Sequence, residues 1–290
     1  MTMASLETAS WSQRRHRAAE LGERWPFAGE VLAFYTALLP VQESAFNATL
    51  ERKPAPADVA AFAVEHAMPG VIEVSVASGP AALMGSVVER FHEADTSELV
   101  RRWLNGGELS AVERFLARAA AGPILEALGA TAGEACSGSR DERHCPACGG
   151  LPQLSYLASS PEDLVIAHRY LECSRCAASW SYGRLTCPAC GENDAARLPV
   201  YSELGSSQAE LSGNVVKPGS SESGAAPAGG LNFPHVRIDA CQSCMHYLLT
   251  VDRVRDGRAV PIVDELAALP LDLYAKELGM SKIVPNLMGF

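Results

Sequence analysis

Apolar residues recur every three or four positions through much of residues 1–130. One stripe consists of Phe27, Val31, Phe34, Tyr35 and Leu38. A second stripe consists of Leu83, Met84, Val87, Val88 and Phe91. Stripes of this kind predict amphipathic helices with buried apolar faces, and they carry no information about a ligand. We therefore expect a helical domain over residues 1–130 that has a core of its own.

Local signals predict where some of these helices begin and end. Ser110 followed by Glu113 is a capping box, which predicts a helix start. Asp58 is a candidate cap for another helix, and Pro69–Gly70 predicts its end. Val71–Ala77 is rich in β-branched residues and also fits a short strand, within a region that we otherwise interpret as helical.

Cysteines dominate the next part of the chain. Residues 131–144 are small, polar and charged, as in a linker. Four Cys-x-x-Cys pairs follow, namely Cys145/Cys148, Cys173/Cys176, Cys187/Cys190 and Cys241/Cys244. Such a turn directs two sulfurs at one point, and two turns supply the tetrahedral four-sulfur set that zinc prefers and iron also uses. The four pairs together predict two metal ions, each held by four cysteines.

An internal repeat indicates which pairs belong together. Cys145 to Gly149 and Cys187 to Gly191 both read Cys-Pro-Ala-Cys-Gly, and Arg169 and Arg237 each precede a later cysteine by four positions. The repeat predicts one ion for the first two pairs and one for the last two. A crossed pairing is also compatible with the spacing.

The sequence also predicts the order of the domains and a fold of the α+β class. A first four-cysteine ribbon covers 145–186, and a second covers 187–256 with a Ser/Gly/Pro-rich loop inserted at about 205–230. Residues 257–290 return to helical character and form a C-terminal tail. The helical domain, the linker 131–144 and two rubredoxin-like or zinc-ribbon modules thus follow one another.

Composition and charge argue against several classes of protein. There is no apolar run of ~20 residues, and no apolar stretch follows Arg14, Arg15 and Arg17, so neither a membrane span nor a secretory signal is expected. In a reducing compartment, paired cysteines indicate metal ligands rather than disulfides. The net charge of −10 disfavours nucleic-acid binding.

Other candidate chemistry is sparse. The sequence has no phosphate-binding loop, no nucleophile elbow and no distinctive pair of carboxylates, so nothing in it nominates an enzyme. Four histidines lie near the cysteine turns, but each set already has four sulfurs; they are His144, His168, His235 and His246. Trp180 and Tyr182 are expected to pack against the ribbon. Cys136, the ninth cysteine, is interpreted as a free thiol in or near the linker.

The motifs together resemble a known family, the formate dehydrogenase accessory protein or FdhE family. The resemblance is carried by the two Cys-Pro-x-Cys-Gly ribbons, by Arg169 to Cys176 leading to Trp180, and by Asn286 to Phe290. It implies a cytoplasmic, non-enzymatic protein that assists maturation of respiratory formate dehydrogenase and binds its catalytic subunit. It also implies that the eight paired cysteines are the ligands and that the metal is iron, whereas the spacing alone favours zinc.

Two other functions remain open at this point. If the sites hold iron, the chain fits a rubredoxin-like protein that transfers electrons during maturation. If they hold zinc, which has no redox chemistry, it also fits a zinc-ribbon adaptor unrelated to formate dehydrogenase. The acidic composition and the large helical region argue against the adaptor.

Overall fold

The computed structural model describes residues 9–93, 95–160, 163–203 and 233–290. The predicted inserted loop at about 205–230 lies outside these residues. Within the described residues, the helices are α1 (Trp11–Arg24), α2 (Gly29–Arg52), α3 (Val59–His66), α4 (Met68–Ser78), α5 (Ala81–Glu93), α6 (Thr96–Leu104), α7 (Ala111–Leu128), α8 (Pro261–Ala267) and α9 (Leu269–Glu277). The strands are β1 (Pro152–Ser160), β2 (Asp163–Cys173), β3 (Ser179–Ser181), β4 (Val200–Tyr201), β5 (Val236–Cys241), β6 (His246–Asp252) and β7 (Ser281–Lys282).

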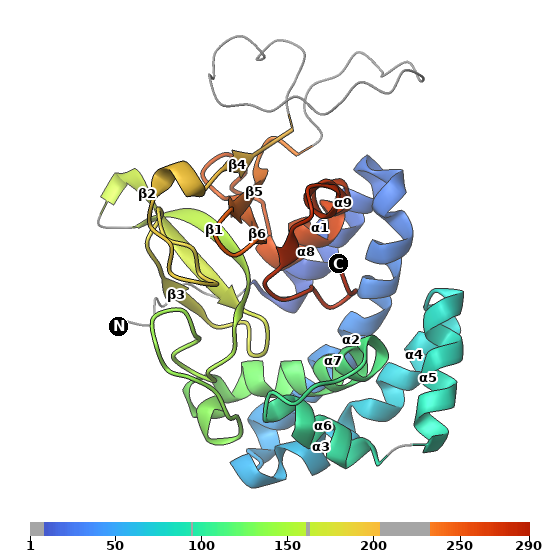
Figure 1. Cartoon of the computed structure of the whole chain (residues 1–290). Coiled ribbons are helices and arrows are strands. Elements are labelled where there is room, and N and C mark those ends of the chain that lie inside the picture. The colour runs from blue at the N-terminus through green and yellow to red at the C-terminus, as the bar shows by residue number, and fades with distance from the viewer. Residues whose placement is uncertain (1–8, 94, 161–162, 204–232) are drawn as a thin grey trace.

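Both ribbons contribute to one mixed sheet, shown in Figure 1 beside the helices. The strand order is β3-β2-β1-β6-β5-β4, and β7 pairs with β6. Each ribbon supplies three antiparallel strands, β1–β3 from the first and β4–β6 from the second. The two sets meet where β1 runs parallel to β6, with Ser155 opposite Thr250. The α+β class predicted from the sequence is confirmed, and the two ribbons form one continuous sheet.

The hydrophobic residues form two cores, and both cross the predicted domain boundaries. The first core contains helical residues such as Leu104 and Leu125 together with Cys145, Cys173 and Trp180. The second joins residues of α1 and α2 to the sheet and to α8 and α9. The expectation that the helical region has a separate core is therefore wrong, because each four-cysteine ribbon shares its core with helices. The proposed segment boundaries themselves stay a prediction.

The helix α2 connects these two cores. In Figure 1 it runs from the vicinity of α1, α8 and α9 to the group formed by α3, α4 and α7, and it contacts members of both groups. Phe34 and Leu38 of α2 belong to the first core, whereas Tyr35 and Leu39 belong to the second. The predicted first stripe is therefore buried on two sides, although Phe27 at its start is exposed.

The helix signals have mixed outcomes. The capping box is confirmed, because Ser110 and Glu113 exchange hydrogen bonds at the start of α7. Asp58 makes no side-chain capping bond, and Pro69 lies in the first turn of α4 instead of ending a helix. The candidate strand Val71–Ala77 lies inside α4.

The prediction that the second stripe forms a buried helix face is only partly correct. Val87 is fully buried, whereas Met84 and Val88 on the same helix α5 are exposed.

Among the described residues no single helix is long and apolar enough to cross a membrane, although the bent pair Pro56–His66 and Met68–Ser78 would pass by length and composition together. Val59, Ala63 and Val71 of that pair are fully buried in the first core.

Candidate metal centres

All four Cys-x-x-Cys turns have the same backbone geometry. The residue directly after the second cysteine has a positive φ in each, namely Gly149, Ala177, Gly191 and Met245. The N–H of that residue donates to the carbonyl of the first cysteine over 2.8 to 3.3 Å. This bond closes a tight turn that places both side chains on one side of the backbone. The two glycines were identifiable from the sequence because glycine adopts a positive φ without steric cost.

The eight cysteines form two groups of four, and the grouping is the one that the repeat predicts. Cys145, Cys148, Cys173 and Cys176 form the first group, and Cys187, Cys190, Cys241 and Cys244 the second. Within each group all the sulfur atoms lie within 4.8 Å of one another. The crossed pairing is thereby excluded for this structure.

The sulfur separations fit a tetrahedral ion. Two sulfurs that are each ~2.3 Å from a zinc ion at the centre of a tetrahedron lie about 3.8 Å apart. The separations are 3.3 Å for Cys148–Cys173 in the first group and 3.8 Å for Cys187–Cys244 in the second. A disulfide would require ~2.05 Å. Four sulfurs at these distances suit zinc or iron equally, so the geometry leaves the choice between the two metals open.

Neighbouring thiols in each group shift one another's pKa in opposite directions, and those of Cys145, Cys148 and Cys241 are lowered. Burial raises the pKa of the Cys173 thiol well above its usual value. Burial likewise raises the pKa of Cys187 to about 11. Metals bind the thiolate form, which is costly to bury without a positive charge nearby. A divalent ion at the centre of each group would supply that charge.

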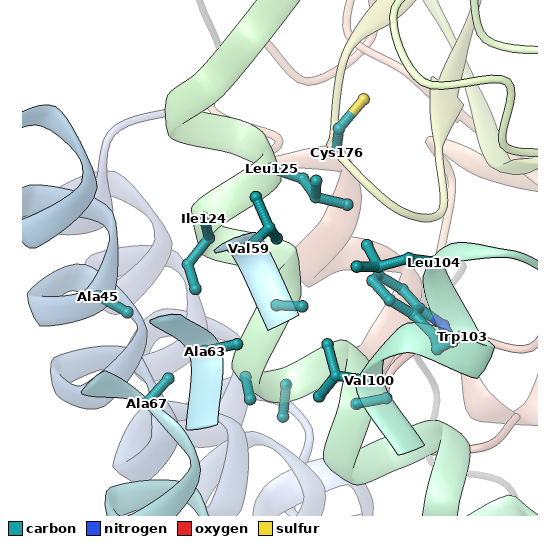
Figure 2. Packing of buried hydrophobic residues seen from close by; sticks show 14 of the residues in the cluster. Ala45, Val59, Ala63, Ala67, Val100, Trp103, Leu104, Ile124, Leu125 and Cys176 are labelled. Carbon is teal, nitrogen blue, oxygen red and sulfur yellow. The ribbon is translucent and has the colours of Figure 1, made fainter. Parts of the chain in front are cut away.

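The two groups differ in their access to solvent. All four cysteines of the first group are buried, whereas Cys190 in the second group is exposed and Cys244 is half-buried. Figure 2 shows Cys176 beside Leu125 of α7, with its sulfur directed away from the helices and toward the ribbon. The first group is thus sealed by the helical core, and the second lies at the surface.

Close packing around the first group requires glycine at position 150. A Cβ added to Gly150 would lie 2.9 Å from the sulfur of Cys173. The corresponding position in the second ribbon is Glu192, whose backbone carbonyl accepts from Cys187 as that of Gly150 does from Cys145. A side chain is therefore compatible with the turn itself, and it is the tight environment of the first group that excludes one.

A polar network crosses the junction between the ribbons, with one residue on each of four neighbouring strands. Arg169 on β2 donates to the hydroxyl of Ser155 on β1 over 3.1 Å. Ser155 shares a 2.6 Å hydrogen bond with Thr250 on β6, and Thr250 donates to Asp239 on β5 over 2.7 Å. Arg237 also donates to Asp239, over 2.9 Å. The two repeated arginines thus meet at one carboxylate, which sequence reasoning did not foresee.

Arg169 also contacts the segment that leads into the second group. Its Nη1 donates to the carbonyls of Gly183 and Thr186, and Thr186 directly precedes Cys187. From the other side, Arg143 donates to the carbonyl of Ala189 inside the second group's first turn. These bonds hold the second group of cysteines against the first ribbon and the segment that precedes it.

The remaining sequence candidates have structural partners. The ring of Trp180 is buried and donates to the carbonyl of Glu142, and Tyr182 donates to the carbonyl of Cys187. Of the described residues, the two sulfur groups contain only cysteines, so none of the four histidines belongs to them. Cys136 lies outside both groups, and burial raises the pKa of its thiol to about 12. It is therefore a neutral thiol at neutral pH.

The comparisons with known proteins were made against this geometry. The family model described as "FdhE, central domain" matches residues 144–184, which contain the whole first group. The model described as "FdhE, C-terminal domain" matches residues 226–288, which contain the last two cysteines of the second group. The chain carries segments of the central and C-terminal domains of the FdhE family.

Individual FdhE relatives agree with this assignment. A "Protein FdhE homolog" of Aquifex aeolicus is 30% identical over 151 residues, which are 51% of this chain and 42% of that protein. One of Pseudomonas aeruginosa strain PAO1 is 30% identical over 144 residues, 50% of this chain and 38% of that protein. The chain spans only about two fifths of the length of these relatives in such matches.

The fold is also that of an FdhE protein. The crystal structure of the FdhE protein from Pseudomonas aeruginosa superposes with a TM-score of 0.62 and covers 97% of each chain. The sequence identity over this superposition is 23%, so the likeness concerns the fold. It extends over the helical region, which the two family models do not cover.

Proposed function

We propose that this chain is a cytoplasmic accessory protein for the maturation of formate dehydrogenase, which binds the catalytic subunit of that enzyme and catalyses no reaction of its own. The observation that carries the proposal is that the matched FdhE domains contain the whole first group of four thiols and two cysteines of the second group. The resemblance of the turns and of residues 286–290 to the formate dehydrogenase accessory family supports the choice of partner.

The eight grouped cysteines are proposed to hold two metal ions, iron or zinc. A bound ion would join turns that are distant in sequence, such as those at Cys187 and Cys241. Metal binding in such sites contributes directly to folding, by about 10–16 kcal/mol of apparent binding energy in small zinc-finger peptides. The net charge of −10 supports the further proposal that nucleic acid is not a partner.

Co-purification tests the proposed partner. The tagged full chain would be expressed together with a formate dehydrogenase catalytic subunit, and the eluate analysed by size-exclusion chromatography. A complex is expected with the wild type and with Cys136→Ser, because Cys136 lies outside both sulfur groups. Cys145→Ser should weaken it by disturbing the first ribbon. The proposal fails if the wild type recovers no catalytic subunit.

A second function is favoured by the exposure of Cys190. An iron ion in the second group would have one sulfur at the surface, where a redox partner has access to it. Iron in such a site supplies one-electron chemistry, whereas zinc does not. The absorption spectrum and metal content of anaerobically purified protein distinguish the two metals. Two zinc ions per chain without a visible band would exclude electron transfer, and colour that bleaches on reduction would support it.

A further inference from the structure

A cavity of about 410 Å³ lies beside the first metal group and is lined by arginines. Its walls come from the loop between α6 and α7, from residues 137–139 and from the turns around Cys145 and Cys173. Arg114 and Arg118 reach it from α7, where residues four positions apart share one helix face. Arg175 reaches it from the turn between Cys173 and Cys176. Cavities of this size accommodate small molecules.

Within the described residues, none of these three arginines forms an ion pair with a carboxylate. Arg114 donates to the backbone carbonyl of Leu109 over 3.1 Å, and Arg175 donates to that of Ser137 over 2.8 Å. Arg118 donates to the carbonyl of Pro285 and to the side-chain oxygen of Gln153. Only neutral oxygens are used, and each guanidinium has five N–H donors.

Arg118 differs in this respect from the other buried arginines. The described residues contain four buried arginines, of which Arg14 pairs with Glu126, Arg17 with Asp264 and Arg169 with Asp239. Arg118 is 8% exposed and makes no direct ion pair within the described residues; it is connected to the carboxylate of Glu265 only through the side chain of Gln153. Buried charges are ordinarily paired, so an unpaired one beside a cavity indicates a missing anionic partner.

The lining residues that the structure describes reinforce this interpretation. They include no aspartate or glutamate, although the chain has 34 acidic residues against 24 basic ones. His144 also lines the cavity and is hydrogen-bonded to Asp141, which does not. Gly106, Gly107 and Gly138 form part of the wall, so a ligand has close access to the backbone there.

We propose that this cavity binds a small phosphate-bearing ligand through Arg114, Arg118 and Arg175. A guanidinium forms two parallel hydrogen bonds to a phosphate, and three of them around one cavity suit a ligand with at least two negative charges. Because Arg175 lies inside the turn that carries Cys173 and Cys176, binding would stiffen one side of the first metal group. The site does not depend on the proposed function.

The competing explanation is that these arginines only balance the charge of the loaded metal group, since four thiolates and a divalent ion carry a net charge of −2. Isothermal titration calorimetry of the metal-loaded full chain at low ionic strength separates the two explanations. ADP serves as the phosphate probe and succinate as the dicarboxylate probe, and the metal content is measured before and after each titration.

The variants Arg114→Gln and Arg175→Gln each remove one guanidinium. Arg175→Lys keeps the positive charge but loses the paired N–H donors of the guanidinium. ADP is expected to bind the wild type, and each Gln variant should weaken binding roughly tenfold, with partial recovery in Arg175→Lys. Arg184→Gln is the matched control, because within the part of the chain that the structure describes Arg184 also donates only to a backbone carbonyl, that of Ala167, and it does not line this cavity.

Four results would overturn the proposal. One is an absence of ADP binding to the metal-loaded wild type, and another is binding that neither Gln variant changes. Binding of succinate in preference to ADP would refute the phosphate assignment. Loss of metal from the Gln variants, with ADP affinity unchanged per loaded chain, would establish charge balance as the role of these arginines.

Discussion

The guanidinium of Arg169 and the carboxylate of Asp239 lie 3.4 Å apart, Nη2 to Oδ2, although one belongs to the first ribbon and the other to the second. Both side chains are largely buried. Burial by itself would raise the pKa of Asp239, but the positive charges of Arg169 and Arg237 outweigh this effect and hold the pKa below its usual value. The pair therefore stays ionised and joins the two halves of the sheet.

Asp239→Asn should destabilise the protein by about 3 kcal/mol, because it leaves the buried charge of Arg169 without a carboxylate. The free energy of unfolding would be measured by urea denaturation of the metal-loaded protein. Glu98→Gln is the matched control, because it breaks an exposed pair with Arg101 and should cost less than about 0.5 kcal/mol. Equal effects of the two substitutions would contradict the role given to the Arg169–Asp239 pair.

Cys187→Ser and Cys145→Ser should each release one metal ion per chain but differ in their effect on the helices. Cys145 is part of the core that α6 and α7 share, whereas Cys187 is not. The melting temperature followed by helical circular dichroism should therefore fall further for Cys145→Ser. Metal analysis gives the stoichiometry. Loss of both ions from either variant would show that the groups are not independent.

Gly150→Ala should weaken metal binding in the first group, because the added methyl would lie 2.9 Å from the sulfur of Cys173. We expect the metal content to fall from two ions toward one, with the second group intact. Gly257→Ala serves as the control, since a Cβ there meets nothing within 4 Å. An undiminished metal content in Gly150→Ala would mean that the surrounding turns can move aside.

Glu113 should contribute stability that depends on pH. A hydrogen bond from the backbone N–H of Ser110 is the main cause that lowers its pKa, and Arg90 lowers it further. Because the folded pKa lies below the unfolded value of ~4.3, the stabilisation is complete above that value and is lost as the pH falls through the folded pKa. The free energy of unfolding of the wild type should thus exceed that of Glu113→Gln by about 1 kcal/mol at pH 6. Urea denaturation would measure both values. A difference between the two proteins that is as large at pH 3 as at pH 6 would contradict this account.

The parts of the site that repeat in sequence were predictable, and those that depend on distant partners were not. The cysteine spacing and the repeated glycines gave the two sulfur groups, because these turns are local structures. Ala177 and Met245 take the same left-handed backbone without a glycine to indicate it. The parallel pairing of Ser155 with Thr250 joins positions 95 apart, for which the apolar pattern contains no information.

The expectation of a separate helical core was the main error, and its cause is physical. A helical stripe reports that a face is buried but does not identify the element that covers it. The helix α1 packs on α8 as well as on α2, and the core of α6 and α7 includes the first ribbon. Met84 and Val88 have helical spacing as well, yet α5 lies at the edge of the bundle and leaves them exposed.

The bond between Arg17 of α1 and Asp264 of α8 sets an order of events during synthesis. The ribosome produces these residues 247 positions apart, and all eight grouped cysteines emerge between them. The nascent chain can thus present all eight thiols while its first helix still lacks its contacts with α8. The second core can therefore close only after α8 and α9 have emerged, because both helices contribute residues to it.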